Sequence, residues 1–153
     1  MFDCGSDPLN RYFRQQVTQD ARRRVTACFV AVEQGKGVLA GYYTVASSSI
    51  PVTDLPDEVT RKLPRYPSVP AVRMGRLAVD RQFKGKGLGA AMLADALERS
   101  LKAEIAAYAL VVDAKDEQAA AFYRHHGFIA LNDNRVALFL PLATTKELLE
   151  RKN

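Results

Sequence analysis

Side chains near the start of the chain, most of them hydrophobic, recur with the spacing of one helical face. The face consists of Leu9, Tyr12, Phe13, Gln16 and Val17. Asp7-Pro8 precedes it as a cap and first-turn pair, because proline is favoured at the start of a helix. The pattern predicts a helix over Leu9–Ala21, followed directly by the basic cluster Arg22–Arg24.

The next segment has the pattern of a β-hairpin. Thr26–Val32 (TACFVAV) and Val38–Ser47 (VLAGYYTVAS) both have the composition of strands, and the turn residues Gln34–Gly37 separate them. Ile50–Pro70 holds five of the seven prolines. It therefore predicts an irregular connection, with one short helix near Pro56–Leu63.

The second half of the chain alternates strands with helices. Val72–Val79 predicts a strand, and Gly87–Ile105 predicts a helix whose apolar stripe is formed by Leu88, Met92, Leu93, Leu97, Leu101 and Ile105. The remaining elements are a strand Tyr108–Val112, a helix Asp116–His126 ended by Gly127, strands Phe128–Ala130 and Val136–Leu140, and a charged tail Lys146–Asn153 that we expect to fray. This order predicts an α/β fold with a mixed sheet, in one domain over residues 1–153.

Composition is that of an ordinary globular domain, with 48% hydrophobic and 25% charged residues. No apolar stretch is long enough to cross a bilayer, so we expect no membrane association. Cys4 and Cys28 are far apart and form no CxxC pair, so we expect neither a metal site nor a disulfide and place the protein in the cytoplasm. The net charge of +5 fits a polyanionic partner and simple solubility equally well.

The run Leu77–Gly89 (LAVDRQFKGKGLG) joins a strand to a helix through a glycine-rich loop. Glycines at 85, 87 and 89 let a ligand approach the backbone closely and can adopt conformations closed to other residues. Free N–H groups at a helix start favour a phosphate. Lys84 and Lys86 add positive charge. The loop lacks the GK[ST] ending of a Walker A motif and the early βαβ context of a dinucleotide site. Taken alone, it is equally consistent with a tight connection.

Two motifs resemble those of the GNAT acyltransferase superfamily. Gln82-x-x-Gly85-x-Gly87 is similar to motif A, which cradles the pyrophosphate of acetyl-CoA, and Ala119-x-x-Phe122-Tyr123-x-x-x-Gly127-Phe128 is similar to motif B. The resemblance implies a GNAT fold, with a mostly antiparallel sheet, splayed central strands and flanking helices. It also implies acetyl-CoA as cosubstrate and no metal. The residues that it assigns to cosubstrate binding are Leu77, Ala78, Val79, Gln82, Lys84, Gly85, Lys86, Gly87, Leu88, Gly89, Asp116, Ala119 and Phe122.

The same resemblance gives Tyr123 the role of catalytic acid. A phenol with an ordinary pKa near 10 is protonated at pH 7 and can donate to a departing thiolate. Packing is the alternative, because Ala119, Phe122, Tyr123 and His126 share one helical face. Asp116 stands where the superfamily often has asparagine, and a carboxylate can still accept from a pantetheine amide.

The acceptor amine must be neutral to attack, and Val72–Val79 offers no carboxylate as a base. An α-amine, with an ordinary pKa of about 7.7–8.0, needs less help than a lysine amine. The sequence therefore favours an α-amine, although Glu33 remains available as a base. His125 and His126 are adjacent on a helix and should point in different directions, one at the surface and one partly packed.

The N-terminal segment Phe2–Phe13 (FDCGSDPLNRYF) resembles the opening of the GNAT-type toxins of bacterial toxin–antitoxin pairs, as do Gly41–Thr44 and Gly75–Asp80. That resemblance implies acetylation of aminoacyl-tRNA, a block of translation, a ribbon-helix-helix antitoxin and a homodimer. It also suggests that a first strand is missing ahead of Phe2. Basic residues that could contact tRNA are Arg22, Arg23, Arg24, Arg73, Arg76 and Arg81.

Two other functions remain open at this point. The chain could be a GNAT enzyme that acetylates a small amine or a protein N-terminus, and an acidic, narrow acceptor pocket would favour this alternative. It could also be a CoA-binding interaction module without enzymatic activity. The presence of Tyr123 argues against this last alternative, because a module that only binds needs no acid.

Overall fold

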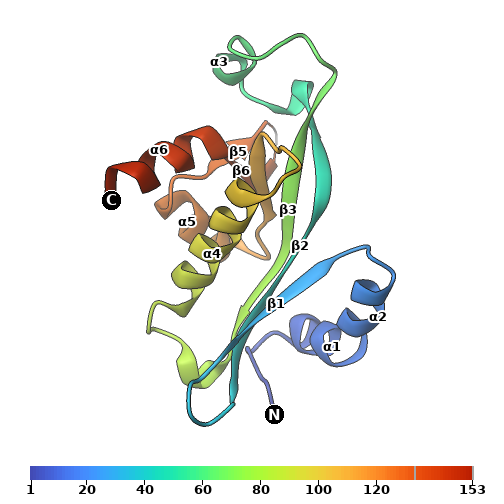
Figure 1. Cartoon of the computed structure of the whole chain (residues 1–153), viewed down its shortest axis with the longest axis vertical. Helices are drawn as coiled ribbons and strands as arrows, with labels where there is room; N and C mark the ends of the chain where they lie inside the picture. Colours follow the sequence, from blue (N-terminus) through green and yellow to red (C-terminus); the bar gives the residue numbers. More distant parts are fainter. Residues whose placement is uncertain (133, 153) are drawn as a thin grey trace. The chain divides into compact units, whose positions relative to one another are not determined.

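The computed structural model describes residues 1–132 and 134–152. Its elements are α1 (Asp7–Gln15), α2 (Val17–Arg22), β1 (Ala27–Val32), β2 (Leu39–Pro51), η1 (Val52–Asp54), α3 (Asp57–Thr60), β3 (Ser68–Val79), η2 (Arg81–Phe83), α4 (Leu88–Lys102), β4 (Ala109–Asp113), α5 (Glu117–His125), β5 (Ile129–Leu131), β6 (Asn134–Pro141) and α6 (Leu142–Lys152). Figure 1 follows them along the chain.

Six strands within the described residues form one sheet in the order β1-β2-β3-β4-β6-β5. The pairs β1–β2, β4–β6 and β5–β6 are antiparallel. The predicted mixed α/β fold, with a mostly antiparallel sheet and helices, is therefore confirmed. The divergence of the central strands stays a prediction.

By their contacts, the residues group into two compact units. The first comprises Met1–Ala46 and Met74–Ala96, and the second comprises Ser47–Arg73 and Leu97–Asn153. Strands β2 and β3 and helix α4 each contribute residues to both units. Each unit has its own core.

The core of the first unit lies between the N-terminal segment and the ends of two strands. Phe2, Cys4, Tyr42 and Ala78 are its buried members. The rings of Phe13 and Tyr42 are 4.7 Å apart between centroids, and the Tyr42 hydroxyl donates to the carbonyl of Leu9 at 2.7 Å. These contacts attach the start of the chain to the sheet.

Strand β2 approaches its neighbours so closely at Gly41 that no side chain fits there. A Cβ at this position would lie 2.7 Å from the carbonyl oxygen of Ala78 and 2.8 Å from Cε of Met92. The absence of a side chain thus lets strand β3 and helix α4 pack directly against β2. Ala78, one of the predicted cosubstrate contacts, is held at this point of contact.

The prediction of a single helix over Leu9–Ala21 is wrong, because α1 ends at Gln15 and α2 begins at Val17. Gln16, with φ −123° and ψ −33°, interrupts the helix. The Tyr12 hydroxyl donates to Asp20 Oδ2 at 2.7 Å, whereas a straight helix would separate these residues by about 12 Å along its axis. The break therefore accommodates a tertiary hydrogen bond that local periodicity does not reveal.

The core of the second unit contains buried residues from strands β2, β3, β4 and β6. Ala109 and Val111 of β4 and Phe139 of β6 are fully buried, together with Ile50, Leu55, Val69 and Ala71. Helices α5 and α6 pack against β6. The predicted elements Tyr108–Val112, Asp116–His126, Phe128–Ala130 and Val136–Leu140 are confirmed with shifts of one or two residues.

Two predicted strand ends were wrong, because β2 continues to Pro51 and β3 begins at Ser68. Ile50 and Val69 are among the buried core residues of the second unit, and this burial extends the strands beyond the predicted ends. Pro70 lies within β3 and has no N–H to donate, while its carbonyl accepts from the N–H of Tyr108 at 2.8 Å. The short helix near Pro56–Leu63 is confirmed as α3.

Two further predictions at helix ends were wrong. Helix α4 ends at Lys102, so Ile105 lies beyond the apolar stripe and is exposed. The segment expected to fray from Lys146 belongs instead to α6, which begins at the buried Leu142 and also buries Thr145. Helix α6 contacts β4 and β6. Asn153, the last residue of that prediction, lies outside the described residues.

Candidate active site

The glycine-rich loop leads from the short helix η2 into α4, and the loop and the start of α4 lie within the first unit. Gly85 and Gly87 have φ of +77° and +82°, and a Cβ on either would meet no atom within 4 Å. The first α4 hydrogen bond runs from Ala91 N–H to Gly87 O. The N–H groups before Ala91 therefore remain available, as a pyrophosphate requires. The backbone fits the phosphate end of acetyl-CoA.

The third glycine of the motif has a different role. Gly89 lies in the first turn of α4, and the glycines with positive φ include Gly85 and Gly87 but not Gly89. The expectation that all three glycines need special backbone conformations is therefore wrong for Gly89. In a helix, a glycine leaves room for close packing of its surroundings.

The two lysines of the loop differ in their surroundings. Lys84 Nζ donates to the carbonyl oxygen of Cys4 at 2.7 Å, so its ammonium is held against the N-terminal segment. Lys86 Nζ lies 5.7 Å from the centroid of the Phe83 ring. Lys86 is exposed and adjoins Gly87, and it is the better placed of the two to approach a phosphate.

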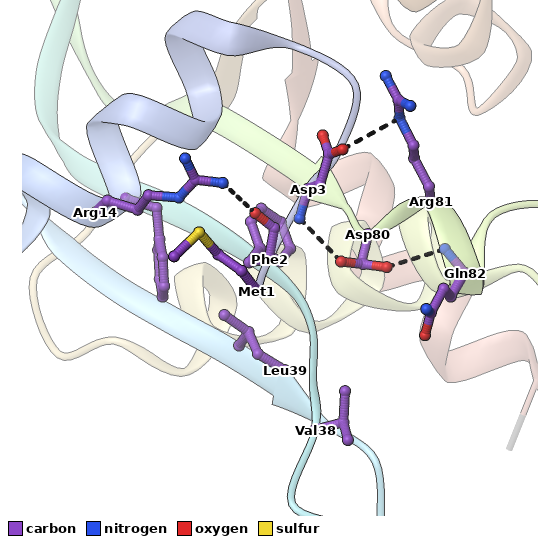
Figure 2. A pocket seen from close by; sticks show the side chains of 10 residues that line it. Met1, Phe2, Asp3, Arg14, Val38, Leu39, Asp80, Arg81 and Gln82 are labelled. Carbon is purple, nitrogen blue, oxygen red and sulfur yellow. Dashed lines mark hydrogen bonds and ion pairs between the residues drawn. The ribbon is translucent and has the colours of Figure 1, made fainter.

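A cavity of about 750 Å³ lies beside the start of the loop. Figure 2 shows residues of the N-terminal segment on one side of it, and Asp80, Arg81 and Gln82 on the other. Asp80 is buried, and its Oδ1 accepts from the N–H of Gln82 at 2.9 Å. Gln82, the first residue of the motif, is therefore fixed at its backbone while its side chain is exposed.

The strand that precedes the loop carries the three residues predicted to face pantetheine and acetyl. Ala78 is buried, whereas Leu77 and Val79 are half-buried. This alternation is typical of a strand with one face in the core. Glu33 lines a separate cavity of about 320 Å³ together with Lys86, Gly87 and Leu88. It thus neighbours the pyrophosphate end of the predicted site and not the Leu77–Val79 stretch.

Tyr123 lies in α5 of the second unit and is only 6% exposed. Its ring is 5.3 Å from that of Phe122 and 5.5 Å from that of Phe128, between centroids. Burial raises the pKa of the Tyr123 phenol well above its ordinary value, and the negative charge of Asp113 raises it further. The hydroxyl therefore keeps its proton at neutral pH, as an acid must before the reaction.

Helix α5 is held at both ends by the residues that the motif supplies. Asp116 is its N-cap, and its Oδ1 accepts from the N–H of Ala119 at 2.8 Å. Gly127 follows the helix with φ +93°. Asp116 thus already uses one carboxylate oxygen within the helix, which leaves the other for the predicted pantetheine contact.

Of the two histidines after Tyr123, His126 is partly packed as predicted, but the two rings are in contact and do not point apart. Both are exposed, and their rings lie edge to face with centroids 5.2 Å apart. His126 also contacts the Phe122 ring at 4.8 Å. Partial burial lowers the pKa of His126, and the neighbouring His125 lowers it further. His126 is the C-cap of α5 with φ −91° and ψ 15°, a departure from helical geometry that helps to bring the rings together.

The six arginines predicted to contact tRNA fall into two groups. Arg22, Arg23 and Arg24 are exposed at the end of α2, where Arg24 adopts φ +59°. The other three already have partners: Arg73 pairs with Asp113, Arg76 lies 3.4 Å from the centroid of the Tyr12 ring, and Arg81 Nε lies 3.6 Å from Asp3 Oδ2. Among the six, the α2 cluster offers the most accessible charge.

Sequence reasoning missed the polar residues that fix the backbone just before the loop. Asp3, Asn10 and Asp80 join the N-terminal segment to η2 through hydrogen bonds. Asp80 precedes a short helical turn, a position at which aspartate is a favoured cap. That local signal could have assigned Asp80 to the N-terminus of η2, but not to the distant Asp3.

Among residues 1–132 and 134–152, no cluster of three or more histidine, cysteine, aspartate or glutamate side chains could hold a metal ion. In the same part of the chain, no helix is both long and apolar enough to span a membrane.

Comparison with known families assigns the class of protein. The profile of the acetyltransferase (GNAT) domain family matches residues 6–143. The chain therefore belongs to the GNAT acetyltransferase family, whose members transfer acetyl from acetyl-CoA.

More particular relatives are similar over almost the whole chain. A tRNA-acetylating toxin from Mycobacterium tuberculosis is 33% identical over 150 residues, 97% of this chain and 88% of the relative. The structure of AtaT complexed with acetyl-methionyl-tRNA superposes with a TM-score of 0.89 at 31% identity, covering 97% of this chain and 89% of AtaT. A crystal structure of a KacT mutant has a TM-score of 0.90 at 30% identity, covering 96% and 89% of the two chains.

Proposed function

We propose that this acetyltransferase moves the acetyl group of acetyl-CoA to the α-amine of aminoacyl-tRNA and thereby blocks translation as the toxin of a toxin–antitoxin pair. The observation that carries the proposal is the 33% identity, over 97% of this chain, to a relative named tRNA-acetylating toxin. The similarity to AtaT in complex with acetyl-methionyl-tRNA supports the same acceptor. The whole chain then acts as one acetyltransferase domain.

The proposed reaction is an acyl transfer in which a C–N bond forms and the C–S bond of the thioester breaks. Acetyl-CoA supplies the activated acetyl group, and the attacking amine loses a proton to solvent or to a base. Tyr123 donates the proton that the departing sulfur takes up and recovers one from solvent. Burial supports this role because it keeps the phenol protonated until the sulfur becomes basic.

The absence of a carboxylate from Ser68–Val79, the whole of β3, supports an α-amine acceptor. A lysine amine with a pKa of about 10.4 would need a base to become neutral. An α-amine with a pKa of about 7.7–8.0 is already partly neutral near pH 7. We assign the phosphate contacts of the cosubstrate to the backbone of Gly85–Gly89 and to Lys86. Backbone groups of Leu77 and Val79 then face pantetheine and acetyl.

The tRNA contacts that we favour lie on α2. Arg22, Arg23 and Arg24 are exposed, and such a cluster can pair with phosphates of an acceptor stem in a salt-dependent manner. Arg73, Arg76 and Arg81 would have to leave their present partners, Asp113, Tyr12 and Asp3, or contact tRNA together with them. We therefore expect the α2 cluster to contribute more to tRNA affinity than the other three.

We further propose a cytoplasmic homodimer that is neutralised by an antitoxin of the ribbon-helix-helix type. Support for an antitoxin partner comes from AtaT, whose structure bound to the C-terminus of the antitoxin AtaR is 28% identical to this chain with a TM-score of 0.81. Analytical ultracentrifugation would test the dimer. Co-expression with the product of a neighbouring small gene would test the antitoxin.

The decisive experiment incubates the purified chain with acetyl-CoA and individual charged tRNAs and then analyses the RNA for N-acetyl-aminoacyl-tRNA. We expect acetylation of at least one charged tRNA and none of uncharged tRNA. The absence of product with every charged tRNA would overturn the tRNA assignment. Acetylation of a small amine or of a peptide N-terminus in parallel assays would then support the alternative GNAT functions.

A further inference from the structure

We propose that Asp80, Asn10 and Asp3 are positioning residues that hold the stem of the acetyl-CoA loop in its binding conformation. This inference rests on the proposal that Gln82–Gly89 binds acetyl-CoA. The three residues and their partners Cys4 and Lys84 are called the N-terminal clamp below. Asp80, Asn10 and Asp3 need not touch the cosubstrate for the clamp to act, because the clamp fixes the backbone that leads into the loop.

The centre of the clamp is the buried carboxylate of Asp80, which is 8% exposed as a residue. Its Oδ1 accepts from the N–H of Gln82 at 2.9 Å, and its Oδ2 accepts from the N–H of Asp3 at 3.0 Å. One side chain therefore links two segments that are 77 residues apart. Figure 2 shows Asp80 between them, with a hydrogen bond to each.

Asn10 fixes the N-terminal segment at the end of the hydrogen-bond network opposite to Gln82. Its Nδ2 donates to Asp3 Oδ1 at 2.9 Å, and its Oδ1 accepts from the N–H of Cys4 at 2.9 Å. Asp3 Oδ1 also accepts from the N–H of Gly5 at 2.9 Å. These donors lower the pKa of the Asp3 carboxyl, with the Gly5 N–H as the largest cause. Asn10 is 5% exposed, so its amide has little water to replace these partners.

The clamp engages the stem of the loop at three successive points. The N–H of Arg81 donates to the carbonyl of Asp3 at 2.9 Å, the N–H of Gln82 donates to Asp80, and the ammonium of Lys84 donates to the carbonyl of Cys4 at 2.7 Å. The loop tip that follows is different, because a Cβ on Gly85 or Gly87 would meet no atom within 4 Å. A fixed stem thus carries an open tip.

The fixed conformation of the loop stem must come from the buried hydrogen bonds and not from the surface ion pair. Arg81 and Asp3 form an ion pair with a 3.6 Å separation, but their side chains are 65% and 46% exposed. Exposed pairs contribute little because water and salt screen them. Asp80 and Asn10 are buried and satisfied by hydrogen bonds, and losing one partner leaves a buried polar group unpaired.

A loop that is already ordered loses less conformational freedom when a ligand binds. Loss of the clamp should therefore weaken the affinity for acetyl-CoA and leave the rate of the chemical step nearly unchanged. In Asp80→Asn, one of the two N–H groups would face an amide N–H in place of an oxygen. In Asn10→Ala, both side-chain hydrogen bonds of the residue are lost.

The test measures KM and kcat for acetyl-CoA at saturating acceptor, and Kd by calorimetry, for both variants. We expect KM and Kd to rise about tenfold, which corresponds to about 1.4 kcal/mol at 25 °C, while kcat changes less than about twofold. A fall in kcat with KM unchanged would overturn the proposal. If Asp80→Asn does not fold, Asp3→Asn, at a half-exposed side chain, takes its place in the test.

The matched control is Asn132→Ala. Asn132 Nδ2 donates to the carbonyl of Leu55 at 2.8 Å and also bridges 77 residues of sequence, but it lies in the second unit. We expect a lower Tm and an unchanged KM for acetyl-CoA. An equal rise in KM in this control would reduce the clamp effect to general destabilisation and overturn the proposal.

Gly87→Ala separates failure of the clamp from failure of the loop assignment. A raised KM in Gly87→Ala, with unchanged KM in the clamp variants, would overturn the clamp and leave the loop as the cosubstrate site. Unchanged KM in all of these variants would overturn the assignment of Gln82–Gly89 and the clamp with it. Neither result bears on the acceptor, which the charged-tRNA assay tests independently.

Discussion

The proposed phosphate-binding loop and the Tyr123 region carry the two motifs of the family, but they are built in opposite ways. Gly85 and Gly87 are exposed, and open space surrounds the positions where side chains would begin. Tyr123 is 6% exposed and packs between two aromatic rings. The loop can change without disturbing the core, whereas the phenol belongs to a packed ring and also has the proposed catalytic role. Substitutions in the loop should therefore affect activity more than stability, whereas those at Tyr123 can affect both.

The largest effect should come from Tyr123→Phe. The variant keeps the ring contacts with Phe122 and Phe128 and removes only the hydroxyl. Because general acid catalysis contributes about 10²–10⁴-fold, kcat should fall by about that factor. Steady-state kinetics measures this, and thermal unfolding should show a small change in Tm. Tyr108→Phe, at a half-buried tyrosine of the same unit, should keep its kcat.

Unchanged acetylation by Tyr123→Phe would mean that the phenol only packs. The loop would then bind the cosubstrate, and the Tyr123 region would serve only as part of the core. A CoA-binding module without enzymatic activity would follow only if wild-type protein also fails to acetylate any amine tested.

The next effect should separate two glycines with the same backbone conformation. Gly87 and Gly35 have φ of +82° and +89°, and a Cβ on either meets no atom within 4 Å. Replacement by alanine costs about 1–2 kcal/mol of backbone strain at both positions. Only Gly87→Ala should raise KM for acetyl-CoA, by about tenfold, because only that Cβ enters the proposed phosphate site. Urea unfolding and steady-state kinetics measure the two quantities, and equal KM values would remove Gly87 from the site.

A third comparison concerns stability within the first unit. In Gly41→Ala, the new Cβ would lie 2.7 Å from the carbonyl oxygen of Ala78, and such overpacking costs about 1–3 kcal/mol. Gly75→Ala places its Cβ 3.7 Å from Thr44 Oγ1, an ordinary contact, and should change the free energy of unfolding by less than about 0.5 kcal/mol. Denaturant titration compares them. Equal values would show that β2 can move away from β3 at little cost.

The smallest effect concerns the break between α1 and α2. The Tyr12 hydroxyl is the largest cause of the lowered pKa of Asp20, which ordinarily titrates at 3.8. A lowered pKa in the folded state contributes stability above pH 3.8, and this contribution is lost as pH falls through the lowered value. Tyr12→Phe should return the Asp20 pKa toward 3.8 and weaken that acid dependence. NMR titration of the Asp20 carboxyl carbon measures the shift, and an unmoved pKa would contradict the prediction.

Sequence patterns predicted the elements whose signals are local. Helix α5 with the glycine after it and the β1–β2 hairpin were correctly predicted, as was helix α4 apart from its end at Lys102. Each depends on periodicity, capping or turn residues within a few positions. The loop and Tyr123 were found through motifs of the same local kind, and their proposed roles remain predictions.

What the sequence could not reveal depends on partners far along the chain. The break at Gln16 accommodates the hydrogen bond between Tyr12 and Asp20, and the length of β3 follows from the burial of Val69. The N-terminal clamp joins Asp3 to Asp80 across 77 residues. No local pattern encodes such a pairing, because tertiary contacts override propensity.

Cys4 provides a chemical probe of how often the clamp opens. Its thiol is 3% exposed and contacts the carbonyl of Ser6, so an alkylating reagent reaches it only when the segment opens. With Cys28, the one other cysteine in the chain, replaced by serine, the rate of Cys4 labelling reports the opening equilibrium of the folded protein. The cell's own oxidants would meet the same barrier, so the redox sensitivity of this enzyme should follow how often its N-terminal segment detaches.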